Sequence, residues 1–303
     1  MALPSYASPL ERLWRYTYLL ICTAIFIFLI APILIVIPLS FNAEPYFTFT
    51  EKMLAFDPEG YSLRWYDILL TFGMAAPEAA RDGAWWADVW ENATWVQVAK
   101  NSAIVGVFST LLATVLGTIA ALGLSRPEMP YRRAIMAVLI SPMIVPIIIT
   151  ATGLFFFYSS TGLSGSYAGV VLAHATLGIP FVIITVTATL IGFDRSLSRA
   201  AASLGASPTT SFFKITMPLI MPGVVSGALF AFVTSFDEVV VVLFVAAHDQ
   251  QTIPRQMWNG IREQISPAIL SVATILVVIS IALLAMVEIL RRRSEKLRGV
   301  TPY

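Results

Sequence analysis

The chain has 303 residues, of which 57% are hydrophobic and 12% are charged, and its mean hydropathy is +0.80. Soluble domains carry about 25% charged residues, so this composition excludes an ordinary soluble domain and indicates a protein surrounded by membrane lipid. The net charge of +1 comes without a basic face, which gives no reason to expect a nucleic-acid partner. The single cysteine, Cys22, excludes a disulfide within the chain.

Six apolar windows are long enough for a membrane-spanning helix, which takes about 20 residues: residues 14–41, 101–124, 134–158, 168–191, 219–244 and 265–290. The first is too long for a signal-peptide core and has no cleavage pattern, so we expect it to be retained. Prolines within several windows predict kinks: Pro32, Pro142, Pro146 and Pro180. The sequence predicts an all-α membrane protein with six transmembrane helices in a single domain, residues 1–303.

The loops between these windows differ in their basic residues. With the N-terminus in the cytoplasm, thirteen Lys and Arg residues fall on the cytoplasmic side and six on the external side. Basic residues favour the cytoplasmic side of short loops. We therefore expect both termini in the cytoplasm and the longest loop, residues 42–98, outside.

The external segment 42–98 carries nine acidic residues against three basic ones. Its Trp and Tyr side chains suit helices that lie at the membrane interface. Two compatible interpretations follow: a lid packed over the helix bundle, and a docking surface for an external protein.

The segment 196–208 is small and rich in hydroxyl groups, and it lies between two apolar windows. Three alanines favour a helix over Ser196–Leu204, and Gly205 can end it in the left-handed conformation. Pro208 suits the first turn of a second short helix. Such a small-faced helix can enter a groove on another protein, and an ordinary cytoplasmic loop is the alternative. The segment contains no nucleophile–base pair, metal cluster or phosphate-binding loop.

The pattern Arg199-Ala-Ala, three residues, Gly205, nine residues, Ile215-Thr-Met217-Pro218 resembles the EAA signature of ABC importer permeases, E-A-A-x3-G-x9-I-x-L-P. The flanking stretches LAHATLGIPFVIITVTATLIGFDRSL, LIMPGVVSGALFAFVTSFDEVVVVLFV and TIPRQMWNGIREQISPAI resemble the second permease subunit of spermidine/putrescine importers. The resemblance runs from about Asn101 to the C-terminus, and the Trp-rich stretch 75–92 lies outside it.

The resemblance implies a binding-protein-dependent permease with the type I importer fold, in which a cytoplasmic coupling loop, here about 194–218, contacts a cleft of an ATPase. Carried over by position, the coupling residues would be Arg199, Ala200, Ala201, Ser203, Leu204, Gly205, Ala206 and Pro208. Arg199 stands where the family has glutamate, so any contact of that glutamate must be rebuilt here, for instance with an acidic partner residue. Met217 replaces a leucine of similar volume.

Two adjacent acidic residues lie inside the fifth window, where ionisable groups are costly and indicate function. Asp237 follows Pro222 by 15 residues, about 22 Å along a helix, which predicts a place in the outer third of the bilayer. Neighbours on a helix diverge by about 100°, so one carboxylate can face the pathway while the other pairs elsewhere. A purely structural role is the alternative. The candidate pathway residues for a cationic substrate are Ser235, Asp237 and Glu238.

His174 and His248 are the chain's two histidines. His174 has no Cys, Asp or Glu nearby in the sequence, so we expect it to be packed and hydrogen-bonded. No metal site is predicted.

The chain contains no P-loop, so we expect neither an ATPase site nor a cofactor in it, and ATP and Mg²⁺ would bind to a cytoplasmic ABC ATPase dimer. The resemblance implies a second, homologous permease subunit and a periplasmic substrate-binding protein, at the bacterial inner membrane. The expected function is import by alternating access of a small solute, most readily a polyamine such as putrescine or spermidine. The same machinery for an aminophosphonate, opine or amino acid is the alternative. A secondary carrier would need inverted repeats and an intramembrane enzyme facing catalytic groups, and we find neither in the sequence.

Overall fold

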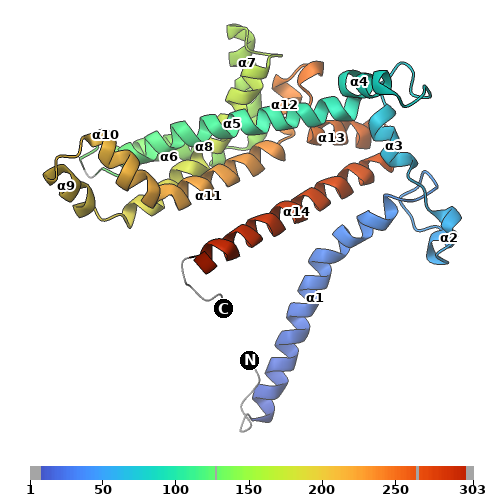
Figure 1. Ribbon diagram of the computed structural model, residues 1–303, viewed down its shortest axis with the longest axis horizontal. Coiled ribbons are helices and arrows are strands. Elements are labelled where there is room, and N and C mark those ends of the chain that lie inside the picture. The colour runs from blue at the N-terminus through green and yellow to red at the C-terminus, as the bar shows by residue number, and fades with distance from the viewer. Residues whose placement is uncertain (1–7, 127, 264–265, 298–303) are drawn as a thin grey trace. The chain divides into compact units, whose positions relative to one another are not determined.

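The computed structural model describes residues 8–126, 128–263 and 266–297. In these residues every regular element is helical, apart from an isolated antiparallel bridge between Asn42 and Tyr61 (Figure 1). The prediction of an all-α protein is therefore confirmed for this part of the chain. Two compact units form: one from the chain up to Ala80 together with the chain from Gly260, and one from Arg81–Asn259.

The first unit is built around two long helices, α1 (Pro9–Leu39) and α14 (Ala268–Leu297). Ser8 caps α1 in a capping box with Glu11, which satisfies backbone N–H groups that the first turn leaves free. The Ser271 hydroxyl donates to the carbonyl of Ser40 at 3.3 Å, so α14 contacts the end of α1. Three short helices complete the unit: α2 (Glu51–Leu54), η1 (Pro58–Gly60) and α3 (Arg64–Thr71).

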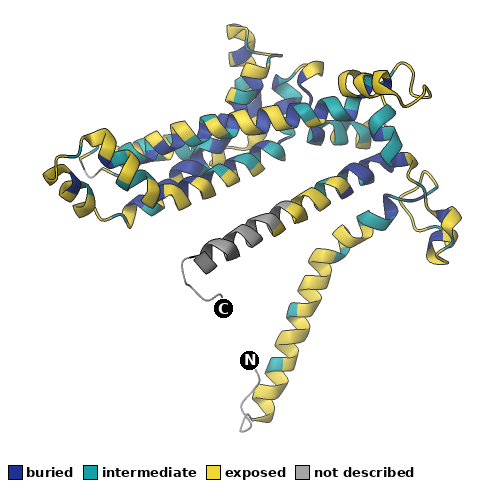
Figure 2. Cartoon of the chain, in the orientation of Figure 1, coloured by how far each residue is buried: buried dark blue, intermediate teal, exposed yellow. Residues whose placement is uncertain are grey.

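Helix α1 is exposed over almost its whole length within its unit (Figure 2). None of its most hydrophobic 18-residue window is buried. An apolar helix that packs on little of its own chain needs lipid or another membrane helix around it.

The second unit has three helices at its centre: α5 (Thr94–Leu124), α8 (Tyr167–Ile191) and α11 (Met217–Phe236). Glycine lets their backbones approach, since a Cβ added to Gly178 would lie 2.9 Å from the Ala231 Cβ, and one added to Gly227 would lie 2.8 Å from the Val182 Cα. Small residues at such contacts are typical of helix packing in membranes.

The third apolar window is one bent pair of helices rather than a single kinked span. Helices α6 (Arg132–Ile144) and α7 (Ile147–Thr161) meet at 102°. Pro146 lies at the break, where it has no N–H to continue the backbone ladder. The sequence predicts a kink near this proline, and the chain turns here more sharply than a kink.

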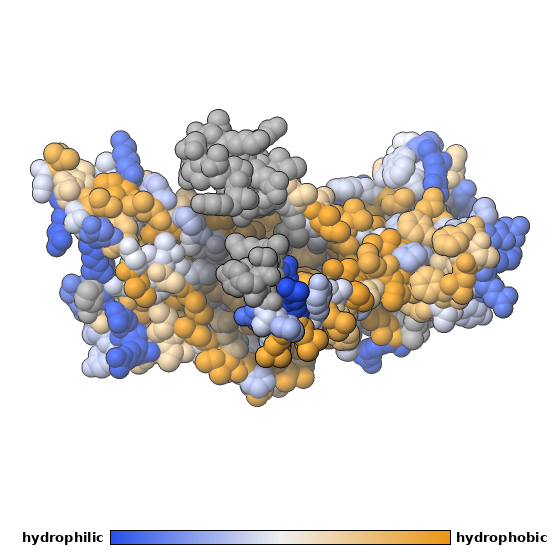
Figure 3. All heavy atoms as spheres, turned by 90° about the horizontal axis from the view of Figure 1, so that it is seen from below, coloured by the Kyte–Doolittle hydropathy of each residue, from blue (hydrophilic) through white to orange (hydrophobic). Residues whose placement is uncertain are grey.

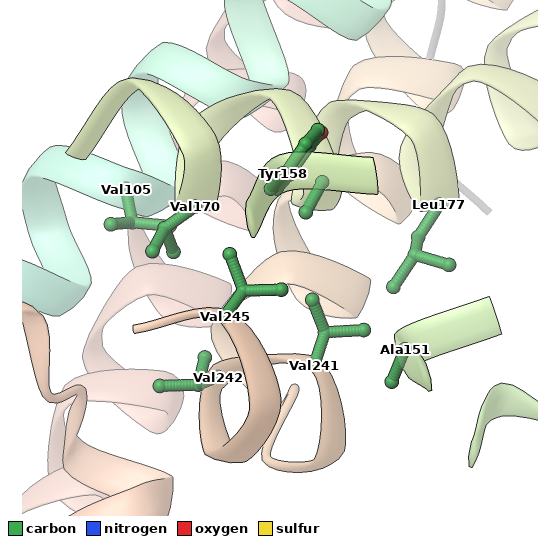
Figure 4. Close-up of a cluster of buried hydrophobic side chains, with 9 residues drawn as sticks. Val105, Ala151, Tyr158, Val170, Leu177, Val241, Val242 and Val245 are labelled. Atoms are coloured by element: carbon green, nitrogen blue, oxygen red, sulfur yellow. The ribbon is translucent and has the colours of Figure 1, made fainter. Parts of the chain in front are cut away.

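The fifth window is also broken, and the prediction of a continuous helix over 219–244 is wrong. Helix α11 ends at Phe236 and a separate helix, α12 (Val240–Val245), follows after three residues. The valines of α12 pack with side chains of α5, α7 and α8 in a buried cluster (Figure 4): Val105, Ala151, Tyr158, Val170, Ala173, Leu177, Val241, Val242 and Val245.

The remaining elements are short: α4 (Gly83–Asn92), α9 (Ser196–Ser203), α10 (Pro208–Ser211), the π-helical turn η2 (Phe212–Thr216), η3 (His248–Gln250) and α13 (Ile253–Glu263). By length and composition four helical stretches can cross a membrane, namely Pro9–Leu39, Thr94–Leu124, Tyr167–Ile191 and Pro208–Phe236, and the bent pair would make a fifth. The sixth window is predicted at residues 265–290. Its described part begins at residue 266, and from Ala268 it belongs to α14. Six spans and cytoplasmic termini stay predictions.

Much of the surface shown in Figure 3 is hydrophobic, and one of several groups of hydrophilic residues lies at the left of that view, toward the end that carries α9 and α10 in Figure 1. An apolar surface beside a polar end is what a membrane protein needs where its helices leave the lipid.

Candidate functional site

The candidate coupling loop begins with a helix that is fixed at its first turn. The Asp194 carboxylate accepts hydrogen bonds from the Ser196 N–H at 2.8 Å and from the Ser196 hydroxyl at 2.7 Å. These bonds, with Arg199 nearby, hold the pKa of Asp194 below its usual range. The Arg195 guanidinium donates to the carbonyl of Ser125 at 2.6 Å, so the loop is tied to the end of α5.

Gly205 makes the turn that the sequence predicts. Its φ is +82°, a conformation that glycine adopts without the steric cost met by other residues. The Gly205 N–H donates to the Ala202 carbonyl and the Ala206 N–H to the Ala201 carbonyl, both at 3.0 Å. These bonds satisfy carbonyls at the end of α9, as in a Schellman motif.

A second short helix follows, also as predicted. The Ser207 hydroxyl accepts from the Thr210 N–H at 3.2 Å, and Pro208 occupies the first turn of α10. The order helix, glycine turn, short helix is therefore confirmed, while contact with an ATPase stays a prediction.

Exposure divides the candidate coupling residues into two groups. Leu204 is 89% exposed, whereas Ala201 is 7% exposed and packs against its own chain. The other exposed candidates are Arg199, Ala200, Ser203, Gly205 and Pro208, and Ala206 is intermediate. Ala201 therefore supports the loop from within, and Leu204 is its most prominent apolar side chain.

Arg199, which stands at the glutamate position of the EAA signature, lies on the exposed side of α9. It makes no salt bridge with any residue that the structure describes. Its charge is thus available to a partner on this face.

The structure separates the two acidic candidates of the pathway. Glu238 is 7% exposed, and its Oε1 accepts a hydrogen bond from the Val241 N–H at 2.8 Å. Asp237 is exposed and terminates α11. Glu238 therefore serves the start of α12, and Asp237 is the carboxylate that is open to its surroundings.

Ser235 belongs to a buried polar chain that joins the three central helices. Its hydroxyl lies 2.9 Å from the Ser109 hydroxyl, which donates to it, and 2.8 Å from the His174 Nδ1. His174 is 1% exposed, so the expectation of a packed, hydrogen-bonded histidine is confirmed. Ser235 is 4% exposed and is engaged within the protein rather than placed on an open surface.

Asn101 holds the segment after α12 in place, a role that is not among those predicted from the sequence. Its Nδ2 donates to the carbonyls of Asp249 and Gln251 at 2.8 and 2.9 Å. The Tyr167 hydroxyl donates to the Asn101 Oδ1 at 2.7 Å. The available signal was a polar amide at the start of an apolar window, which indicates a buried hydrogen bond. The two carbonyls that accept from it could not be predicted, because they lie about 150 residues away in the chain.

Among the described residues, no group of three or more His, Cys, Asp or Glu side chains could hold a metal ion.

Residues 113–296 match the family described as "Binding-protein-dependent transport system inner membrane component". This match covers more than half of the chain, and the chain belongs to this family of ABC transporter permease subunits. It is accordingly a multi-pass protein of the inner membrane.

Two relatives are similar over most of their length. The spermidine/putrescine transport system permease protein PotC of Haemophilus influenzae is 30% identical over 271 residues, which cover 89% of this chain and 95% of the relative. The putrescine transport system permease protein PotI of Escherichia coli is 30% identical over 281 residues, 90% and 88% of the two chains.

A solved structure shares the fold. A chain of a bacterial ABC transporter involved in the import of the acidic polysaccharide alginate superposes with a TM-score of 0.66 over 95% of this chain and 99% of that chain, at 15% sequence identity. At this identity the likeness supports the fold alone.

Proposed function

We propose that this chain is a permease subunit of an ATP-driven importer that moves a polyamine from a periplasmic binding protein into the cytoplasm by alternating access. The observation that carries the coupling role is the exposed helix, glycine turn and short helix of residues 196–211. The substrate follows from the names of the relatives PotC and PotI and from the exposed carboxylate of Asp237.

The topology that fits this role has six spans, with the α6–α7 pair as the third, α11 as the fifth and α14 as the sixth. Both termini then lie in the cytoplasm, because the basic residues favour that side. The α9–α10 loop lies on the same side, where a cytoplasmic protein can reach it, and the end of α11 faces the exterior.

The energy comes from a separate ATPase dimer, which binds ATP and Mg²⁺. Leu204, with Ala200 and Gly205 beside it, enters a groove of that ATPase, since burying a fully exposed leucine contributes about 1.5–3 kcal/mol. Arg199 pairs with an acidic residue of the ATPase. A second, homologous permease subunit completes the pathway, and a binding protein delivers the substrate from outside.

A cationic substrate passes the end of α11 because the Asp237 carboxylate offsets part of the cost of leaving water. The same machinery can serve another small amino-containing solute, such as an amino acid, which carries a negative group as well as its ammonium group. The choice between a diamine and a zwitterion therefore depends on whether a second, negative group is tolerated near Asp237.

The test is ATP-dependent uptake into proteoliposomes that contain the purified complex with its co-purifying subunits and binding protein. We expect putrescine or spermidine uptake that stops without ATP. A permease complex that carries no ATPase, or that transports an amino acid and no polyamine, would refute the coupling role or the substrate, respectively.

A further inference from the structure

A cavity of about 380 Å³ lies between the end of α5, the start of α6 and the end of α8. All three helices belong to the same unit. Its lining combines arginines and hydroxyl groups with apolar side chains: Leu124, Ser125, Arg132, Arg133, Met136, Thr187, Leu190 and Ile191. The coupling residues described above form no part of this lining.

The arginines of this cavity are not paired in a salt bridge within the described part of the chain. Arg132 and Arg133 open α6, and neither makes a salt bridge with a described residue. The N-terminus of a helix carries a partial positive charge, so cations there are unfavourable and anions are favourable. Two adjacent arginines at this end therefore call for an anion.

The first turn of α6 offers further hydrogen-bond donors. Tyr131 precedes it with a φ of +52°, and no side chain caps the turn. Uncapped N–H groups at a helix N-terminus form a ready site for phosphate oxygens. Arginine adds planar, paired donors that match a phosphate group.

A third cation, outside the lining, is bonded to one of the lining residues. The Arg195 guanidinium donates to the carbonyl of Ser125, which lines the cavity.

The other lining residues are apolar, and Ile191 at the end of α8 is 80% exposed. A small inorganic anion would leave this apolar wall without a partner. A phospholipid satisfies both halves, since its phosphate suits the arginines and its acyl chains cover Met136 and Ile191, the two apolar lining residues that the protein does not bury. Basic pockets between membrane helices bind anionic head groups in this way.

We infer that this cavity binds the phosphate of an anionic phospholipid, with the acyl chains along the apolar wall. In the topology proposed above the site lies in the cytoplasmic leaflet, beside the coupling loop that Arg195 ties to α5. The inference rests on that topology but not on the identity of the transported solute.

The test is native mass spectrometry of the full chain, purified in detergent with its co-purifying subunits and titrated with lipids of equal acyl chains. We expect phosphatidylglycerol to bind about tenfold more tightly than phosphatidylcholine, because each basic residue near the surface strengthens the attraction of an anionic lipid. The double variant R132Q/R133Q should lose this preference. The matched control R15Q/R126Q removes the same charge outside the cavity lining and outside the coupling loop, and it should keep the preference.

A second variant and a soluble probe sharpen the result. R132K/R133K keeps the charge but loses the paired donors, so its preference should be intermediate, and its folding can be compared by thermal unfolding. Glycerol 3-phosphate should compete poorly.

Equal binding of the two lipids to the original chain, or an unchanged preference in a folded R132Q/R133Q complex, would overturn the inference. Strong competition by glycerol 3-phosphate would overturn the lipid and assign the cavity to a soluble phosphate. Lipid binding is measured without ATP or substrate, so failure here leaves the proposed transport function untouched.

Discussion

The carboxylate of Glu238 accepts a hydrogen bond from the backbone N–H of Val241 at 2.8 Å. This bond caps a helix that starts near the end of an apolar window, where the sequence predicts an unbroken span. Asp237, one residue earlier, is exposed. Two adjacent carboxylates thus lie in different surroundings, and this difference separates a structural group from a candidate pathway group.

Replacing each carboxylate tests this division. Asp237→Asn should raise the KM for putrescine or spermidine about tenfold, because a charge-assisted contact contributes about 1.5–3 kcal/mol, and it should leave the melting temperature unchanged. Glu238→Gln keeps an oxygen that can accept from Val241, so it should affect uptake less. Uptake kinetics in proteoliposomes, with thermal unfolding in detergent, measure both effects.

Glu238→Ala is the matched stability variant, since it removes the cap and should cost about 1 kcal/mol. If Asp237→Asn and Glu238→Gln both left uptake unchanged, the two residues would have structural roles only.

Gly205 is the second point at which a single residue can be tested. Gly205→Val should uncouple ATP hydrolysis from uptake while the protein still inserts, because a left-handed conformation costs a residue other than glycine about 1–2 kcal/mol. The turn after α9 would then rearrange and displace Leu204. ATPase activity and uptake, measured on the same proteoliposomes, give the coupling ratio.

Gly205→Asn is the control, because asparagine tolerates the left-handed conformation better than valine does. It should keep most of the coupling. A Gly205→Val complex with normal assembly and a normal coupling ratio would exclude the turn from the transmission of force.

The local structure of the coupling loop could be predicted because its signals are local: alanines for the helix, glycine for its end, proline for the next start. The break after Phe236 could not be predicted, because the residues on both sides of it are similarly apolar. The hydrogen bond of Glu238 depends on its side-chain conformation, which the sequence does not give. The sequence predicts a hydrogen-bonded His174 but not its partners, because Ser109 and Ser235 are 126 positions apart and Ser235 and His174 are 61 positions apart. Burial of Ala201 likewise depends on packing that a motif does not encode.

Close helix packing at Gly178 gives a stability prediction. An added Cβ would lie 2.9 Å from the Ala231 Cβ and 3.2 Å from the Ala113 Cβ, so Gly178→Ala should destabilise the fold by about 1–3 kcal/mol through overpacking. Gly153→Ala, where nothing lies within 4 Å of the added atom, should be neutral or slightly stabilising. Thermal unfolding of the detergent-purified variants compares them, and equal melting temperatures would contradict tight packing of α8 between α5 and α11.

Asn101 provides the last test, because it connects α5 with the segment that follows α12. Asn101→Leu leaves the Gln251 carbonyl without its donor, and it leaves the Asp249 carbonyl and the Tyr167 hydroxyl with only each other as partners, at 3.1 Å. Each buried group left unpaired costs about 1–3 kcal/mol, so residues 248–252 should exchange their backbone amide hydrogens faster.

Tyr167→Phe removes one hydroxyl and keeps both Asn101 donors, which predicts a smaller change. Asn92→Ala, at an exposed site where the amide contacts only Asp88 among the described residues, should leave exchange in this segment unchanged. Hydrogen–deuterium exchange with mass spectrometry resolves the three variants. Unaltered exchange of residues 248–252 in Asn101→Leu would show that the valine cluster of α12, rather than the amide, holds the segment.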